Sequence, residues 1–375
     1  MRTAIGPLRR VVVAASVLGL PIAPLTATSC SAPAVVADIT EYPLPAADSL
    51  PEAMAAGPDG RLWFTEGANR VASVSTSGAV TGYDVPTSAS RMRDIATGPD
   101  GNLWFTEAAN NDMKVAKVTT SGVFTEYPLP MVNSLPSSIS AGPDGNIWFT
   151  ETQANRVAKM TTSGVLTEYL MPSFDSWPVD IVAGPDGNLW VTEVNAKKVA
   201  KVTTSGAFSE YMVPGGAAGL LAVGRDGTLW FTMGAANKVG RVSTSGLFTE
   251  YPVPTPGSVP NDIAVDRDGN AWFIEADANK VARITTSGMI TEFPLPAAQS
   301  YPTGVVAGPD GNVWVTERLV NKIAKIVVRE PSSNQAAITV AAVVLGAAIA
   351  LTAVLVLDRR RRRNTPSGRG VARRG

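Results

Sequence analysis

A motif that recurs seven times constrains the fold of this chain more than any other sequence feature. Its form is G-P-D-G-N-L-W-F-T-E, and successive copies are 41, 44, 42, 40, 42 and 42 residues apart. The second glycine of each copy is Gly60, Gly101, Gly145, Gly187, Gly227, Gly269 and Gly311. A period near 40–45 residues with short β-rich segments is typical of propeller blades, and the long 3.6-residue periodicity of helical solenoids is missing. The sequence therefore predicts an all-β, seven-bladed β-propeller.

Each repeat divides into four predicted strands joined by tight turns. In the third repeat the strands are expected at residues 138–141, 146–151, 156–161 and 165–169. The P-D-G and T-S-G segments between them supply proline and glycine, the residues that hairpin turns need. Both kinds of turn should lie on one face of the ring, the turn face. The loops after W-F-T-E and the loops that lead into each first strand should lie on the other, the loop face.

The last repeat lacks its fourth strand. Residues 323–328 form its third, whereas residues 39–45 read I-T-E-Y-P-L-P and match the fourth-strand text of residues 124–130. An open ring would expose strand edges, so we expect the N-terminal strand to complete the last blade.

Two residue types recur in every blade and are predicted to be structural. The tryptophans of the second strands should pack between blades; they are Trp63, Trp104, Trp148, Trp190, Trp230, Trp272 and Trp314. The aspartates of the P-D-G turns should form those turns; they are Asp59, Asp100, Asp144, Asp186, Asp226, Asp268 and Asp310.

Both ends of the chain differ from the repeats. Residues 1–37 carry arginines, an apolar run and small residues up to Ala37, which predicts a secretory signal peptide, with Sec or Tat export left open. The only cysteine, Cys30, precedes that point, so the exported domain, residues 38–330, would contain no disulfide. A short linker, residues 331–335, follows.

Residues 336–357 form an uncharged run that is about 33 Å long as a helix, enough to cross a bilayer. The basic tail, residues 358–375, begins with Asp358 and five arginines and should stay in the cytoplasm. The prediction is a single-pass protein of the cell membrane with its propeller outside. Residues 38–335 contain 21 Lys and Arg against 31 Asp and Glu, a net charge of −10 that argues against nucleic acid as a partner.

The repeat G-P-D-G-N-L-W-F-T-E, followed by N-R-V-A-K-V-T-T-S-G and T-E-Y-P-L-P, closely resembles the virginiamycin B lyase family over residues 38–328. The resemblance implies a seven-bladed propeller whose lyase members open a cyclic depsipeptide antibiotic by elimination at its ester bond. It also implies Mg²⁺ held by glutamate and a histidine base. This chain contains no histidine. Where the family has P-H-G-I text, the matching positions hold Glu52, Arg93, Ser137, Val179, Gly219, Asn261 and Thr303. The histidine base therefore has no counterpart at these positions, because none of these side chains titrates near neutral pH as imidazole does. A buried glutamate with a raised pKa is the alternative base that the sequence leaves open.

Six second strands end in glutamate, and the fifth blade has Met233 instead. The six are Glu66, Glu107, Glu151, Glu193, Glu275 and Glu317. A ring of carboxylates would favour Mg²⁺ or Ca²⁺, or a cationic ligand. The alternative is that each glutamate pairs with a nearby base, as Glu66 could with Arg70 and Glu151 with Arg156.

Residues that depart from the repeat are better candidates for contacting a ligand on the loop face. Three aspartates lie just ahead of the first strands, Trp177 is the only tryptophan outside the repeated position, and Arg93 is a lone base among acidic neighbours. The predicted ligand-binding residues are Arg93, Asp94, Trp177, Asp180 and Asp262.

Two functions of different class fit these observations. The first is a membrane-anchored binding module for a small molecule or a cell-surface protein. The second is a carbon–oxygen lyase of the virginiamycin B lyase type that cleaves a cyclic depsipeptide or lactone ester with Mg²⁺. The missing histidine favours the first hypothesis, and the resemblance over the whole domain favours the second.

Overall fold

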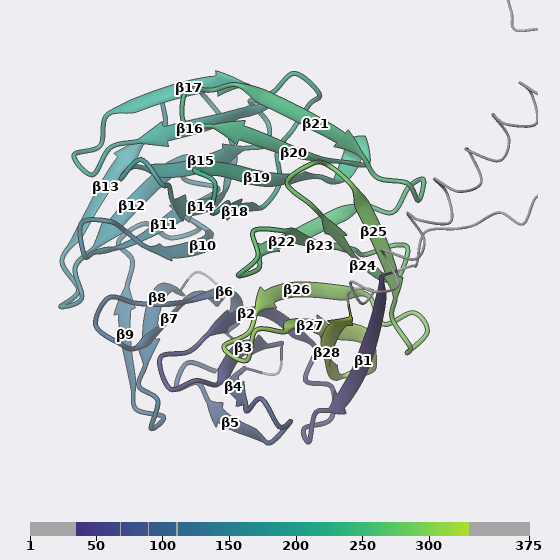
Figure 1. The fold of residues 1–375 in the computed structure, drawn as a ribbon. Coiled ribbons are helices and arrows are strands. Elements are labelled where there is room, and N and C mark those ends of the chain that lie inside the picture. The colour runs from purple at the N-terminus through teal and green to yellow at the C-terminus, as the bar shows by residue number, and fades with distance from the viewer. Residues whose placement is uncertain (1–34, 68, 89, 110–111, 330–375) are drawn as a thin grey trace, which may run out of the picture. The chain divides into compact units, whose positions relative to one another are not determined.

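Seven four-stranded antiparallel sheets make up the computed structural model of the chain (Figure 1). The structure describes residues 35–329 apart from 68, 89, 110 and 111. The first strands of neighbouring sheets contact one another in a closed circuit around the centre (Figure 1). These observations confirm the predicted seven-bladed propeller.

The strands follow the repeat in chain order. The first strands are β2 (Pro51–Ala56), β6 (Arg91–Thr97), β10 (Pro136–Ala141), β14 (Pro178–Ala183), β18 (Leu221–Val223), β22 (Pro260–Val265) and β26 (Pro302–Ala307). The second strands are β3 (Leu62–Glu66), β7 (Leu103–Ala109), β11 (Ile147–Glu151), β15 (Leu189–Glu193), β19 (Thr228–Met233), β23 (Ala271–Glu275) and β27 (Val313–Glu317). The third strands are β4 (Arg70–Val74), β8 (Asp112–Val118), β12 (Arg156–Met160), β16 (Lys198–Val202), β20 (Lys238–Ser243), β24 (Lys280–Ile284) and β28 (Lys322–Arg329).

The fourth strands form the outer edges. They are β5 (Val80–Asp84), β9 (Phe124–Pro128), β13 (Leu166–Leu170), β17 (Phe208–Met212), β21 (Phe248–Pro252), β25 (Ile290–Pro294) and β1 (Val36–Pro43). Two short 3₁₀ turns, η1 (Gly234–Ala236) and η2 (Arg318–Val320), follow the second strands of the fifth and seventh blades. The predicted strands of the third blade agree with the observed ones to within two residues.

The N-terminal strand closes the ring, as predicted. β1 pairs antiparallel with β28 along its whole length, from Val36 opposite Arg329 to Pro43 opposite Lys322. Nζ of Lys322 donates to Glu41 at 2.6 Å, and Tyr42 stacks on Trp314 with ring centroids 5.7 Å apart. β1 begins two residues before the predicted mature N-terminus, so cleavage after Ala37 would remove its first two residues.

The repeated tryptophans pack between blades, as the sequence predicts. Trp63 of the first blade, for example, belongs to a buried cluster with Met92, Ile95 and Phe105 of the second. Each tryptophan also lies against an aromatic ring of its own blade's fourth strand, with centroids 5.4–5.8 Å apart. The repeated tryptophan therefore packs against the fourth strand of its own blade and also against the neighbouring blade.

The turn aspartates lie in their turns, and one blade differs in its hydrogen bonds. In six blades the aspartate accepts a hydrogen bond from the backbone N–H two residues later. In the sixth blade Asp268 also lies in the turn, but Asp266 makes the side-chain bonds: it accepts from the N–H of Asn270 and from the indole of Trp272. The T-S-G turns need glycine for space as well: a Cβ on Gly164, at φ 93°, would lie 2.4 Å from the Tyr127 ring.

Within the part of the chain that the structure describes, no helix is long and apolar enough to cross a membrane. The predicted membrane helix, residues 336–357, lies outside that part, as do the linker, the basic tail and most of the predicted signal peptide.

Ring closure by β1 gives a testable prediction. Deleting residues 36–43 should expose the edge of β28 and abolish the cooperative thermal transition of the whole propeller, measured by circular dichroism. Tyr42→Ala should destabilise by about 1–2 kcal/mol. Tyr83→Ala removes the same kind of stack within the first blade and is the matched control for lost aromatic packing. Unchanged melting of the deletion variant would contradict the closing role of β1.

Candidate functional site

A cavity of about 520 Å³ lies at the centre of the ring, at the loop-face ends of the first strands. One residue near the start of the first strand lines it in six of the seven blades; these residues are Glu52, Arg93, Ser137, Val179, Asn261 and Thr303. These are the positions at which the resemblance places P-H-G-I histidines. The cavity therefore occupies the family's histidine positions, and none of its walls carries an imidazole.

Three predicted site residues, Asp94, Asp180 and Asp262, line the cavity together. They occupy the same place in the second, fourth and sixth blades, and the other blades have Ala53, Ser138, Leu220 and Gly304 there. Each aspartate accepts a hydrogen bond from a backbone N–H of the next blade. The donors are Ile139 to Asp94 at 2.9 Å, Leu221 to Asp180 at 2.5 Å and Val305 to Asp262 at 2.7 Å. The aspartates thus fasten neighbouring blades around the cavity.

Ser138 bridges two of the three aspartates, Asp94 and Asp180. Oγ of Ser138 lies 2.5 Å from Asp180 Oδ1 and 2.9 Å from Asp94 Oδ2. A serine hydroxyl has one proton, which it shares between these two carboxyl groups. Burial raises the pKa of Asp94 to about 6 and that of Asp262 to about 7, and it also raises the pKa of Asp180. The cavity wall is therefore less negative near neutral pH than its composition suggests.

Arginines contribute the opposite charge. Arg91, Arg93 and Arg318 line the cavity, and Arg318 pairs with Glu52 at 3.3 Å. Burial lowers the pKa of Arg93, and the positive charge of Arg91 lowers it further. The predicted site residue Arg93 thus lies in the cavity beside a second cation.

The fifth predicted site residue, Trp177, lies in the loop between the third and fourth blades, and it is not among the residues that line the cavity. Trp177 has a φ of 56° and is followed by a proline. Four other bulky residues also have positive φ and precede a proline at the start of their blade. Together with Trp177 they form the pre-proline collar: Leu50, Leu135, Trp177, Val259 and Tyr301, with φ between 46° and 56°. Such backbone is strained for bulky side chains and clusters at functional sites. Sequence analysis noted only Trp177, although the recurrence before proline was visible.

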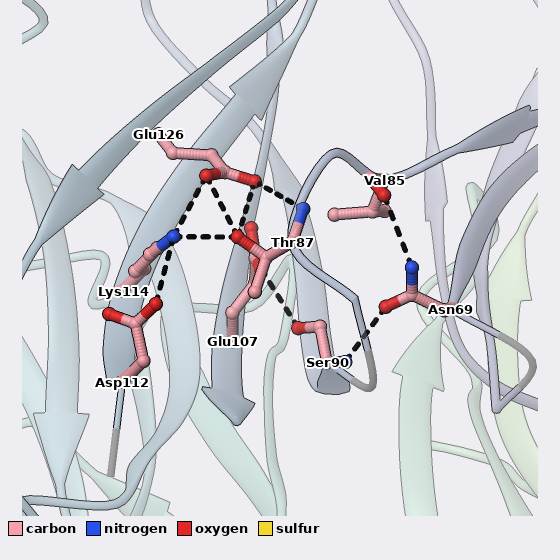
Figure 2. Close-up of polar contacts among 8 residues, drawn as sticks. All are labelled: Asn69, Val85, Thr87, Ser90, Glu107, Asp112, Lys114 and Glu126. Atoms are coloured by element: carbon pink, nitrogen blue, oxygen red, sulfur yellow. Dashed lines mark hydrogen bonds and ion pairs between the residues drawn. The ribbon is translucent and has the colours of Figure 1, made fainter. Parts of the chain in front are cut away.

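The six glutamates at the ends of the second strands are all buried and do not line the cavity. Figure 2 shows the arrangement in the second blade, where Ser90 Oγ donates to Glu107 at 2.8 Å and the Ser90 N–H donates to Asn69. Burial raises the pKa of Glu107, Glu151, Glu193, Glu275 and Glu317 to about 7 and also raises the pKa of Glu66. These glutamates lie on six different blades, so they do not form one shared site.

The third-strand bases pair mainly with fourth-strand carboxylates and not with the second-strand glutamates that were predicted as their partners. Arg70 does approach Glu66, at 3.8 Å, but Arg156 pairs with Glu168 at 2.8 Å and not with Glu151. Glu168 is on the fourth strand, and Lys114 in Figure 2 likewise pairs with Glu126 at 2.9 Å. A third-strand base lies between the second and fourth strands, and the fourth-strand carboxylate is the less buried partner, as Glu168 is beside the fully buried Glu151.

The described residues do not fit the Mg²⁺ or Ca²⁺ site that sequence analysis predicted. Within the described ranges, no three carboxylates gather as metal ligands. The six glutamates are distributed over six blades, and the cavity aspartates already accept backbone hydrogen bonds. No chemical step is therefore derived through a metal, and binding of Mg²⁺ or Ca²⁺ stays a prediction.

Comparison with known proteins establishes the family. The model of the virginiamycin B lyase family matches residues 31–223 and 113–342, so the chain belongs to this family. A streptogramin B lyase structure is 36% identical, with a TM-score of 0.74 over 78% of this chain and 98% of that one. Virginiamycin B lyase from Staphylococcus aureus, substituted with selenomethionine, is 33% identical, with a TM-score of 0.74 over 78% and 99%.

A third similar structure is a catalytically inactive virginiamycin B lyase from Staphylococcus aureus, a histidine-to-alanine variant with quinupristin. It is 33% identical to this chain, with a TM-score of 0.73 over 78% of this chain and 99% of that one. Among curated proteins, no sequence matches the chain.

The raised glutamate pKa values predict how stability depends on pH. A carboxyl whose pKa is about 7 when folded and about 4.3 when unfolded binds more protons in the folded state, so its contribution to stability falls as pH rises between these values. Glu193→Gln should therefore stabilise the propeller at pH 8 by about 1–3 kcal/mol and lessen the loss of stability from pH 5 to pH 8. Denaturant unfolding at both pH values measures this.

Glu250→Gln is the matched control for this substitution. Glu250 pairs with Lys238 at 2.8 Å in the blade that has Met233 in place of the buried glutamate. This variant should leave the pH dependence unchanged. An unaltered pH dependence in Glu193→Gln would show that the buried glutamate is ionised throughout.

Proposed function

We propose that the propeller binds a compact peptide-like ligand, of the cyclic depsipeptide class, in its central cavity without cleaving it. The observation that carries this proposal is the cavity wall. The positions that hold histidines in the family face the cavity, and here they hold carboxylate, guanidinium, hydroxyl, amide and aliphatic groups. The binding cavity is kept and the imidazole base is lost.

The relatives support both halves of the proposal. The inactive Staphylococcus aureus enzyme lacks one histidine and was nevertheless solved with quinupristin. This chain lacks every histidine and has a propeller of the same family. Ligand binding without turnover is thus the behaviour that the comparison favours.

The cavity and the pre-proline collar suit such a ligand physically. The cavity volume of 520 Å³ is within the range of small-molecule sites. Tyr301 belongs to both the cavity wall and the collar. An amphipathic ring could place polar groups against the wall and apolar side chains against the collar.

The proposed setting is the outer face of the cell membrane. The support is the uncharged run of residues 336–357 with its arginine flank, together with the signal-like residues 1–37. The protein would present its cavity outside the cell as a binding module.

Quinupristin tests the proposal directly. The full-length protein is incubated with the antibiotic and Mg²⁺, binding is measured by calorimetry, and the product is examined by mass spectrometry. We expect saturable binding and intact antibiotic. Ser137→Trp should fill the cavity and weaken binding by roughly tenfold or more. Ser163→Trp, in the T-S-G turn of the same blade, is the matched control and should bind normally.

Three outcomes would count against the proposal. Linear product would establish a histidine-free lyase, and a rise in melting temperature with Mg²⁺ would support the metal-dependent alternative. No binding at all would exclude this ligand class.

A further inference from the structure

Two arginines of β6 face the cavity and form no ion pair within 4 Å among the described residues, although the nearby charge of Glu52 acts on Arg93 and opposes the lowering of its pKa. Arg91 and Arg93 both line the cavity, and the buried Nε of Arg93 donates no hydrogen bond. The third cavity arginine, Arg318, is already paired with Glu52. Adjacent guanidinium groups repel one another, so an arrangement of this kind is stabilised when an anion binds between them.

The cavity carboxylates do not supply that anion. Both oxygens of Asp94 accept backbone hydrogen bonds, from Ile95 at 2.8 Å and from Ile139 at 2.9 Å. Asp180 and Asp262 are held in the same way, by Leu221 and Val305 of the next blades. The aspartates therefore bond to the backbone of the cavity wall, and the charged groups left without a hydrogen-bonded partner there are the two arginines of β6.

We propose that Arg91 and Arg93 form a subsite for a carboxylate, so that the cavity prefers peptide-like ligands with a free acid group. The planar guanidinium forks match a carboxylate in two parallel hydrogen bonds. Asn261 and Thr303 offer neutral polar contacts elsewhere on the cavity wall. The inference rests on the proposed binding function and names the ligand class of the same cavity.

A matched pair of ligands tests the subsite. Alkaline opening of the ester of quinupristin gives a linear acid, and the corresponding linear amide has the same shape without the charge. Calorimetry with the full-length protein should show the acid binding roughly tenfold or more tightly than the amide, because hydrogen bonds to a charged group are stronger. The preference should decrease at high salt.

Substitutions assign the preference to its residues. Arg93→Gln should remove most of the difference between acid and amide, and Arg93→Lys should keep part of it, because the charge stays and the fork is lost. Arg225→Gln, at the R-D-G turn of the fifth blade on the opposite face, is the control and should keep the preference for the acid. Thermal melting confirms that each variant is folded.

The outcomes separate this inference from the proposed function. Equal affinity for acid and amide, with intact quinupristin also bound, overturns the carboxylate subsite and leaves ligand binding in place. Binding of none of the three ligands overturns both. A preference that survives Arg93→Gln overturns the assignment to Arg93.

Discussion

The pairing of β1 with β28 is the interaction on which the rest of the structure depends, because it joins the two ends of the described domain and closes the ring. Every blade packs its repeated tryptophan against the next blade, so each sheet is buried only if it has neighbours on both sides. Without β1, the seventh blade would expose the edge of β28, and Trp314 would lose the ring of Tyr42. Closure also fixes the first strands around the centre, and the cavity exists only because that circuit is complete.

Glutamates of this domain behave differently according to their strand. A fourth-strand glutamate such as Glu210 accepts hydrogen bonds from Lys198 and Ser173, and these contacts lower its pKa. A second-strand glutamate such as Glu193 lies deeper in the same blade, where burial raises its pKa. The charge of a carboxylate in this fold thus depends on the depth of its strand and on whether a base can reach it.

The cavity shows how function can change on a repeat scaffold. The scaffold requires tryptophan, turn aspartate and glycine in each blade, and these residues recur. The second and third positions of the first strands are free to differ because they face the cavity. Three aspartates accept hydrogen bonds from the next blade in alternate blades, and Arg93 occupies one of the positions at which the resemblance places histidine. A propeller of this family thus forms without any histidine, because the repeated residues that build the blades do not line the cavity.

The sequence by itself determined the seven blades, the closing strand and the structural role of the tryptophans, because these follow from a local repeat that is read one blade at a time. It also placed Arg93, Asp94, Asp180 and Asp262 on the loop face. Only the tertiary structure decided that these four share one cavity, that the six glutamates do not, and that Arg156 pairs with Glu168 rather than Glu151. The reason is physical: burial, charge pairing and backbone hydrogen bonds between blades join residues about 40 positions apart, and a repeat pattern contains no information about depth.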